Sequence, residues 1–229
     1  MQRKVITTAD GSSTIQIEDW NEQYHSVHGA IQEANHVYIK HGFLFYCETE
    51  NNLRQLSPEV EINILEIGFG TGLNALLTLL KSEDLNLNVN YTGVEAYPIS
   101  TKELDRLNYT KELEIKDSTL KDMHDLPWEI KNQISESFSL KKQQGRFENI
   151  SEKNKYDVIY FDAFGPRVQP ELWTEQIFKK MYLALRKNGV LSTYSAKGSV
   201  RRNLKSVGFE VERLQGPPGK RHMLRAVKR

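Results

Sequence analysis

Apolar runs alternate with amphipathic segments from residue 61 to the C-terminus. INILEIG (62–68), NVNYTGVEA (88–96) and YDVIYFDAF (156–164) are apolar enough to predict strands that are covered on both faces. Between them, LNALLTLLK (73–81) and STKELDRLN (100–108) have helical spacing. This alternation predicts an α/β fold, a doubly wound and mostly parallel sheet with helices on both faces.

The later segments continue the pattern and end in two strands joined by a GPPG turn, which predicts an antiparallel C-terminal hairpin. We expect strands at 137–145, 190–196, 209–215 and 222–229, a helix at 197–208, a helical piece around LPWEIKNQI (126–134), and a long helix over 170–189 closed by Gly189.

The first sixty residues have a different pattern. VITTADGSSTIQI (5–17) contains a turn-forming Asp10-Gly11 pair between β-prone runs, which predicts a hairpin, and residues 20–42 have weak helical character. We therefore expect an N-terminal extension over residues 1–60 and the main domain over 61–229.

Composition narrows the function classes. The 229 residues are 38% hydrophobic, with no membrane-length apolar window and no apolar stretch at the start that would indicate a secretory signal. The single cysteine, Cys47, cannot form an internal disulfide and has no neighbouring ligand set. These features favour a cytoplasmic protein and argue against a structural metal.

Charge is unevenly distributed along the chain. The net charge is +1, but residues 197–229 carry ten Lys and Arg against two acids, so that segment has a net charge of +8 and the rest of the chain −7. A basic segment on an acidic body indicates either a polyanionic partner or a solvated basic face.

LEIGFGTGLN (65–74) lies at the predicted junction of a strand and a helix. Glycines let a backbone turn sharply or approach a ligand, and the amides at the helix start can donate to it. The spacing G-x-G-x-G differs from the dinucleotide fingerprint G-x-G-x-x-G. Glu95 follows at the end of the next predicted strand, where one carboxylate can accept hydrogen bonds from both hydroxyls of a ribose.

These features resemble the class I S-adenosylmethionine-dependent methyltransferases, which implies a Rossmann-like seven-stranded sheet and a sulfonium cofactor without a phosphate. The cofactor-binding residues implied are Glu66, Gly68, Phe69, Gly70, Gly72, Asn74, Glu95 and Asp162. The chain departs from this class after its third strand, where Arg146 stands at the place of an acid near the adenine. Backbone amides around 145–147 or Glu148 are alternatives for adenine recognition.

Asp162 ends the strand YDVIYFDAF, at the sheet edge where ligands of such folds bind. With Phe164 two residues later, it resembles the acid-and-aromatic motif of enzymes that methylate amines. Methyl transfer mainly requires positioning and a desolvated site, and an alkylamine must also lose a proton before it attacks. We expect Asp162 and Phe164 to be catalytic, with Asp162 either orienting the amine or also accepting its proton.

Nearly the whole chain resembles the methyltransferase of the MnmC/MnmD family, on LEIGFGTGLN, DAFGPRVQPELW (162–173), TYSAKGSVRRNLKSVGF (193–209) and GPPGKRHML (216–224). The upstream segment NEQYHSVHGAIQEANHVYIKHG (21–42) resembles the N-terminal lead-in of the family, which lies close to the catalytic pocket. The resemblance implies methyl transfer from S-adenosylmethionine to the exocyclic amine of 5-aminomethyl-(2-thio)uridine at the tRNA wobble position. Because this chain stops at Arg229, it implies a stand-alone form with no FAD and no metal, coupled in function to the enzymes that make the aminomethyl precursor.

The basic tail then predicts a contact surface for the anticodon stem-loop. Its candidates are Lys197, Arg201 and Lys205, which recur every four residues on one helical face, and Lys220 and Arg221 on the hairpin turn. Tyr24, with His25 and His28, is a candidate for the rim of the pocket, although these histidines are equally compatible with a core role.

Other functions remain open on this fold. An aminopropyltransferase of the spermidine-synthase type and a small-molecule amine N-methyltransferase use similar sheets, and a non-catalytic RNA-binding module is the alternative from another class. Loss of methyl transfer in an Asp162→Ala variant that still binds RNA would separate the enzyme from the binding module.

Overall fold

A computed structural model describes residues 2–49 and 60–229, and within them the strands form one three-stranded and one eight-stranded sheet. The strand order of the large sheet is β10-β11-β9-β8-β4-β5-β7-β6. The bounds of its strands are β4 (Glu61–Ile67), β5 (Asn88–Glu95), β6 (Lys131–Ser135), β7 (Phe138–Gln144), β8 (Tyr156–Phe161), β9 (Leu185–Thr193), β10 (Glu210–Gln215) and β11 (His222–Val227).

The inner strands β7, β5, β4, β8 and β9 are parallel, and β6, β11 and β10 are added at the two sides by antiparallel pairing. The α/β doubly wound fold and the C-terminal hairpin are thus confirmed. The strand count is one higher than the seven implied by the resemblance, because β6 pairs with β7 at the sheet edge.

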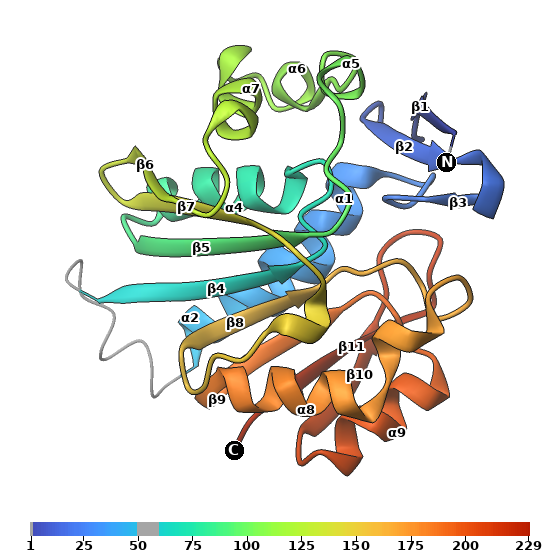
Figure 1. Cartoon of the computed structure of the whole chain (residues 1–229), viewed down its shortest axis with the longest axis vertical. Helices are drawn as coiled ribbons and strands as arrows, with labels where there is room; N and C mark the ends of the chain where they lie inside the picture. Colours follow the sequence, from blue (N-terminus) through green and yellow to red (C-terminus); the bar gives the residue numbers. More distant parts are fainter. Residues whose placement is uncertain (1, 50–59) are drawn as a thin grey trace.

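Helices cover both faces of the large sheet (Figure 1). Their bounds are α1 (Ala30–Ala34), the π-helical η2 (Asn35–Leu44), α2 (Phe45–Glu48), α4 (Leu73–Asp84), α5 (Thr101–Leu104), α6 (Tyr109–Glu112), α7 (Ser118–Asp125), α8 (Glu175–Ala184) and α9 (Gly198–Ser206), with single 3-10 turns η1 (Glu18–Trp20), η3 (Phe147–Asn149) and η4 (Pro170–Trp173). Within the described residues, no helix is both long and apolar enough to cross a membrane.

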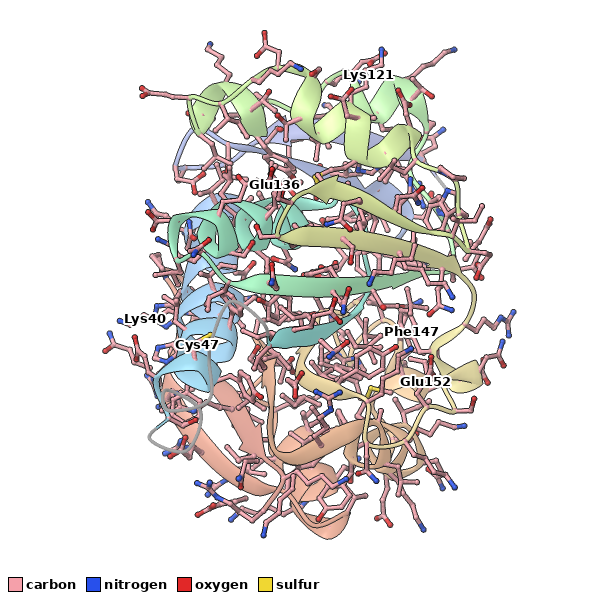
Figure 2. All side chains as sticks on the ribbon, turned by 90° about the vertical axis from the view of Figure 1, so that its left-hand side faces the viewer. Lys40, Cys47, Lys121, Glu136, Phe147 and Glu152 are labelled. Atoms are coloured by element: carbon pink, nitrogen blue, oxygen red, sulfur yellow. The ribbon has the colours of Figure 1, made fainter. Side chains whose placement is uncertain are left out.

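Alternation along β4 explains the two-sided core. Ile64 packs with the cluster that contains α4 and η2, whereas Leu65 packs with the cluster under α8 and α9. Successive side chains of a strand point to opposite faces, so a strand that is apolar at every position needs a cover on each side. Figure 2 labels Cys47, which is buried where α2 lies against the sheet.

The N-terminal residues form the predicted hairpin, β1 (Arg3–Thr7) and β2 (Ser13–Ile17), with the short β3 (Glu22–Gln23) beside it. In Figure 1 this small sheet lies to the right of the main sheet. The weakly helical segment becomes the continuous α1–η2–α2 helix, whose buried residues share one core cluster with α4. The division at residue 60 stays a prediction.

The helix predicted over 170–189 is present as α8 but ends earlier than expected, and the helical piece predicted around 126–134 is wrong. Helix α8 ends at Ala184, and Leu185 already pairs with Tyr156 as the start of β9. Gly189 therefore caps no helix. It lies at an irregularity of β9, where an added Cβ would come within 2.9 Å of the Arg186 carbonyl oxygen.

The second error concerns LPWEIKNQI. The helix of this region is α7, which ends before it at Asp125, and Lys131 to Ser135 form strand β6. Ile130 and Ile134 are four positions apart, a spacing that suits one face of a helix and also alternate positions of a strand. Pairing with β7 decides between the two.

Candidate functional site

The glycine loop between β4 and α4 packs directly against the end of β8. Gly68, Gly70 and Gly72 have φ angles of 90°, 51° and 77°, a region that disfavours side chains with a Cβ. A Cβ on Gly68 would lie 2.7 Å from the carbonyl oxygen of Asp162. The first glycine is therefore needed for both its conformation and its close approach to the neighbouring strand.

Glu95 ends β5 and ties the loop to that strand. Its Oε2 accepts a hydrogen bond from the Gly70 amide at 2.9 Å, and its Oε1 accepts one from the Tyr97 amide at 2.8 Å. The side chain lines the main cavity beside the loop. Each carboxylate oxygen has a second lone pair, so Glu95 can still accept hydrogen bonds from a ligand.

Asp162 lies at the carboxyl end of β8, where two donors hold its carboxylate. The Tyr38 hydroxyl donates to Oδ1 at 2.5 Å, and the Asn74 side-chain amide donates to Oδ2 at 2.8 Å. Burial raises the pKa of Asp162 to about 7, and the bond from Tyr38 opposes that rise. Asp162 therefore changes charge near neutral pH.

Glu66 lies behind this site and does not line the cavity. The same Asn74 amide nitrogen donates to Glu66 Oε1 at 2.8 Å, and the Glu66 side chain is buried. Burial raises the pKa of Glu66 well above its ordinary value. Its position makes Glu66 a support for Asn74, and the prediction that it contacts the cofactor gains no support here.

Aromatic side chains form the wall next to Asp162. The Phe164 ring meets the Tyr24 ring edge-on at 5.0 Å and the Trp20 ring edge-on at 5.5 Å. The Trp173 indole N–H donates to the Phe164 carbonyl at 2.8 Å and fixes this turn. Burial raises the pKa of Tyr24 far above its ordinary value, so its hydroxyl stays neutral.

Lys220 reaches the cavity from the turn between β10 and β11. Its ammonium group pairs with the buried Glu33 carboxylate at 2.5 Å and lies 3.9 Å from the centre of the Tyr194 ring. The charge of Lys220 is thus paired with a carboxylate of the protein itself, although its side chain is 31% exposed. Contact of Lys220 with RNA stays a prediction. The neighbouring Arg221 is exposed.

The cavity encloses about 450 Å³ and brings together most of the predicted site. The predicted residues that line it are Tyr24, Gly68, Phe69, Gly70, Asn74, Glu95, Asp162, Phe164 and Lys220. His25 and His28 also line it, as do Arg146, Phe147 and Glu148, which stay candidates for the adenine. Phe147 is labelled in Figure 2, beside the ends of the strands.

Six predicted residues lie outside the lining of the cavity: Glu66 and Arg221, described above, and Gly72, Lys197, Arg201 and Lys205. Gly72 caps the start of α4, where a Cβ would meet the His124 ring at 3.0 Å. Lys197 and Lys205 are exposed and Arg201 half-buried along α9, outside the lining of the cavity. Because β9 runs parallel to β8, α9 begins at the same sheet edge as Asp162.

Sequence reasoning missed Tyr38 and Glu33. They come from the N-terminal helix and lie five positions apart, which in an α-helix separates side chains by roughly 140°. The π-helical turns of η2 have i→i+5 hydrogen bonds and change that relation. The signal available in the sequence was an acid and a tyrosine, Glu33 and Tyr38, among the apolar residues of a weakly helical segment.

Comparison with known proteins agrees with this geometry. The family described as S-adenosyl-L-methionine-dependent methyltransferase matches residues 129–229. The "tRNA 5-methylaminomethyl-2-thiouridine biosynthesis bifunctional protein MnmC" of Leptospira interrogans is 30% identical over 218 residues, 90% of this chain and 32% of that protein. The protein of the same name from Nitrosospira multiformis is 29% identical over 217 residues, 90% of this chain and 34% of that protein.

The chain thus spans about a third of the length of these curated relatives. Among solved structures, MnmC2 from Aquifex aeolicus has a TM-score of 0.74 at 27% identity, covering 98% of this chain and 70% of that one. Spermidine synthase from Thermotoga maritima has a TM-score of 0.61 at 16% identity, covering 99% and 70%, and shows the fold alone. The chain is therefore similar to S-adenosyl-L-methionine-dependent methyltransferases over residues 129–229, and to proteins of the MnmC type over nearly its whole length.

Proposed function

We propose that the chain transfers a methyl group from S-adenosylmethionine to the exocyclic amine of 5-aminomethyl-(2-thio)uridine at the wobble position of tRNA. The observation that carries this proposal is the Asp162 carboxylate, held by two donors inside an aromatic-walled cavity next to the glycine loop. An acid that titrates near pH 7 suits an amine that must lose a proton.

The residues around the cavity fit the methyl donor. The positive φ angles of the loop leave backbone without side chains at Gly68 and Gly70, which lets a ligand approach closely. Glu95 retains lone pairs for a pair of ribose hydroxyls, and Phe69 adds an apolar surface beside them. These residues and Asn74 are the ones we expect to hold S-adenosylmethionine.

S-adenosylmethionine, when bound, supplies an activated methyl group on a sulfonium. The chain's own residues act on the acceptor. Asp162 in its ionised form accepts a hydrogen bond from the protonated amine and takes one of its protons, which leaves a neutral amine with a free lone pair and a protonated Asp162. Phe164 and Tyr24 limit the directions in which the amine can lie and exclude water from it.

A tRNA substrate agrees with the names of the relatives and with the charge of the tail. Lys197, Arg201 and Lys205 lie on the helix that begins at the edge of the active site, where they can contact phosphates of the anticodon stem-loop. Function in the cytoplasm, coupled to the enzymes that make the aminomethyl precursor, is part of the same proposal.

The direct test is incubation of the protein with methyl-labelled S-adenosylmethionine and tRNA that lacks the final methylation, followed by nucleoside analysis. We expect label in 5-methylaminomethyluridines only. Label in a polyamine or another small amine would instead support an amine-modifying enzyme of another specificity. Binding of tRNA without any transfer would support a non-catalytic module.

We predict that exchanging the three cations of α9 for glutamine (Lys197→Gln, Arg201→Gln and Lys205→Gln together) weakens tRNA binding and flattens its salt dependence. Each phosphate contact to a single strand contributes about 0.7 to the slope of log Kd against log salt, so the slope should fall by about 2. Binding is measured by filter retention between low and physiological salt.

A matched control exchanges Lys102, Lys111 and Lys121 for glutamine. These lysines are exposed on α5, α6 and α7, on the opposite side of the fold from α9 (Figure 1). The same number of charges is removed, but the salt slope should not change. An equal loss of slope in both triple variants would contradict a contact surface on α9.

A further inference from the structure

Tyr38 is a polar contact to Asp162 that comes from the N-terminal helix, far in sequence from the glycine loop and from β8. Its side chain is 1% exposed, and its hydroxyl donates to Asp162 Oδ1 at 2.5 Å. The other oxygen of the carboxylate receives the Asn74 amide from the start of α4. Two elements far apart in sequence therefore fix the direction of one carboxylate.

We propose that Tyr38 is a positioning residue of the methyl transfer, whose hydroxyl orients the Asp162 carboxylate and stabilises its ionised form. This inference rests on the proposed function, in which the ionised Asp162 accepts a proton from the amine. Tyr38 donates to Asp162 and is not among the residues that line the cavity, so it acts on the acceptor only through the acid.

The fold places the Tyr38 ring rigidly. The π-helical segment η2 packs on the sheet at Gly42, where a Cβ would lie 2.7 Å from the Ser192 hydroxyl oxygen. The Tyr38 ring lies against the Tyr160 ring of β8 at 5.3 Å, two residues before Asp162. Single π-helical turns are frequent at functional sites. Here the π-helical turns of η2 bring the Tyr38 hydroxyl to the end of β8, where it donates to Asp162.

The electrostatics of Asp162 depend on few groups. Tyr38 and Asn74 donate to it, Glu66 lies behind Asn74, and the Tyr194 hydroxyl donates to the neighbouring Ala163 carbonyl. Glu33 raises the pKa of Asp162 and Lys220 lowers it, and these two form an ion pair whose effects largely oppose each other.

The hydrogen bonds from Tyr38 and Asn74 are therefore the main interactions that favour the carboxylate against burial. Burial and the nearby acid raise the pKa of Tyr38 well above its ordinary value. The Tyr38 hydroxyl consequently stays a donor throughout the pH range of an enzyme assay.

The test compares the carboxyl titration of Asp162 in the wild-type protein and in Tyr38→Phe, followed by NMR of protein labelled with ¹³C at the aspartate carboxyl groups. Removing a donor to the charged form raises the pKa of the acid, and we expect a rise of about one to two units. The acidic limb of kcat/KM should move by the same amount, with an activity loss of about fivefold or more at pH 7 that shrinks toward pH 9.

Tyr160→Phe is the matched control. It also removes a buried hydroxyl from the same aromatic cluster, but that hydroxyl lies 3.1 Å from the Thr78 hydroxyl and not at Asp162. The Asp162 titration should not change in this variant. A fluorinated tyrosine at position 38, which is a stronger donor in a nearly unchanged shape, should lower the pKa of Asp162 and tests the same bond without loss of packing.

An unchanged Asp162 titration in Tyr38→Phe, or equal shifts in Tyr38→Phe and Tyr160→Phe, would overturn the inference. The titration is measured without tRNA or methyl donor, so it is independent of the proposed function. If the wild-type protein failed to methylate tRNA while the titration shifted as expected, the proposed substrate would be wrong and the link between Tyr38 and Asp162 would stand.

Discussion

Replacing Asp162 by asparagine is expected to lower the rate of methyl transfer at saturating S-adenosylmethionine by about 10²- to 10⁴-fold, the range typical of a general base. Asparagine keeps the shape of the side chain but cannot accept a proton from the amine. The measurement is single-turnover transfer of labelled methyl to undermodified tRNA, with tRNA affinity measured in parallel. Affinity for tRNA should change little, because Asp162 lies inside the cavity and not on the basic helix.

The pH dependence of the wild-type enzyme supplies a second readout of the same residue. The pKa of Asp162 is about 7, so the acid is protonated and inactive as a base well below that pH. The transfer rate should rise as the pH increases through 7 and level off above it. The Asp162→Asn variant should lack this limb.

Stability separates a loss of chemistry from a loss of structure. The folded-state pKa of Asp162 lies above the ordinary value of a free aspartate, so the folded protein holds a proton that the unfolded chain has already lost. This acid therefore costs stability as the pH rises from about 4 to 7. Asp162→Asn should therefore not lower the thermal unfolding temperature at pH 8. If the unfolding temperature is unchanged, the loss of methyl transfer in this variant is a loss of chemistry and not of structure. A fully active variant would show that Asp162 is not the base.

The sequence predicted the sheet well where apolar residues occur on both faces of a segment. Strands β4, β5 and β8 carry apolar side chains on both faces because helices cover both, and such segments are readable without a structure. The prediction failed where a helix passes directly into a strand, as at Leu185, because leucine fits both and the decision depends on pairing with Tyr156.

The residues of the candidate site likewise fall into those that the sequence predicted and those that it did not. Gly68, Glu95 and Asp162 were found because each stands next to a predicted strand end, and parallel strands bring those ends to one edge. Tyr38, Glu33 and Tyr194 were missed because none of them stands at a predicted strand end, and their roles depend on contacts with distant residues. The placement of Lys220 depended on an ion pair with Glu33, and no local pattern predicts a partner 187 residues away.

The contact between Gly68 and Asp162 connects the loop proposed to hold the methyl donor to the acid proposed to serve the acceptor. The Gly68 amide donates to the Val94 carbonyl at 3.0 Å, and the Asp162 amide donates to the Ile67 carbonyl at 2.9 Å. Backbone hydrogen bonds thus connect the ends of β4, β5 and β8 at one place. A change that moves the loop must also move the Asp162 carboxylate, so both substrates would be affected together.

Replacing Gly68 by alanine is accordingly expected to remove nearly all methyl transfer. The new Cβ would lie 2.7 Å from the Asp162 carbonyl oxygen, a backbone atom that cannot rotate away, and the φ angle of 90° is unfavourable for alanine. The left-handed conformation alone costs about 1–2 kcal/mol, and relief of the contact requires the loop to shift. Calorimetry should show S-adenosylmethionine binding weakened by at least about tenfold, the equivalent of about 1.4 kcal/mol.

Gly145→Ala is the control for this substitution. Gly145 lies between β7 and the cavity-lining Arg146, its φ is not positive, and a Cβ there would meet no atom within 4 Å. Alanine keeps the backbone amide of position 145, which donates to the Glu95 carbonyl at 3.0 Å, so the amides around 145–147 are not altered. We therefore expect this variant to bind S-adenosylmethionine and to transfer methyl groups as the wild type does. If Gly68→Ala bound the donor normally but had lost transfer, the loop would position Asp162 without holding the cofactor. If both variants retained full activity, the close packing of the loop on β8 would have no part in the function.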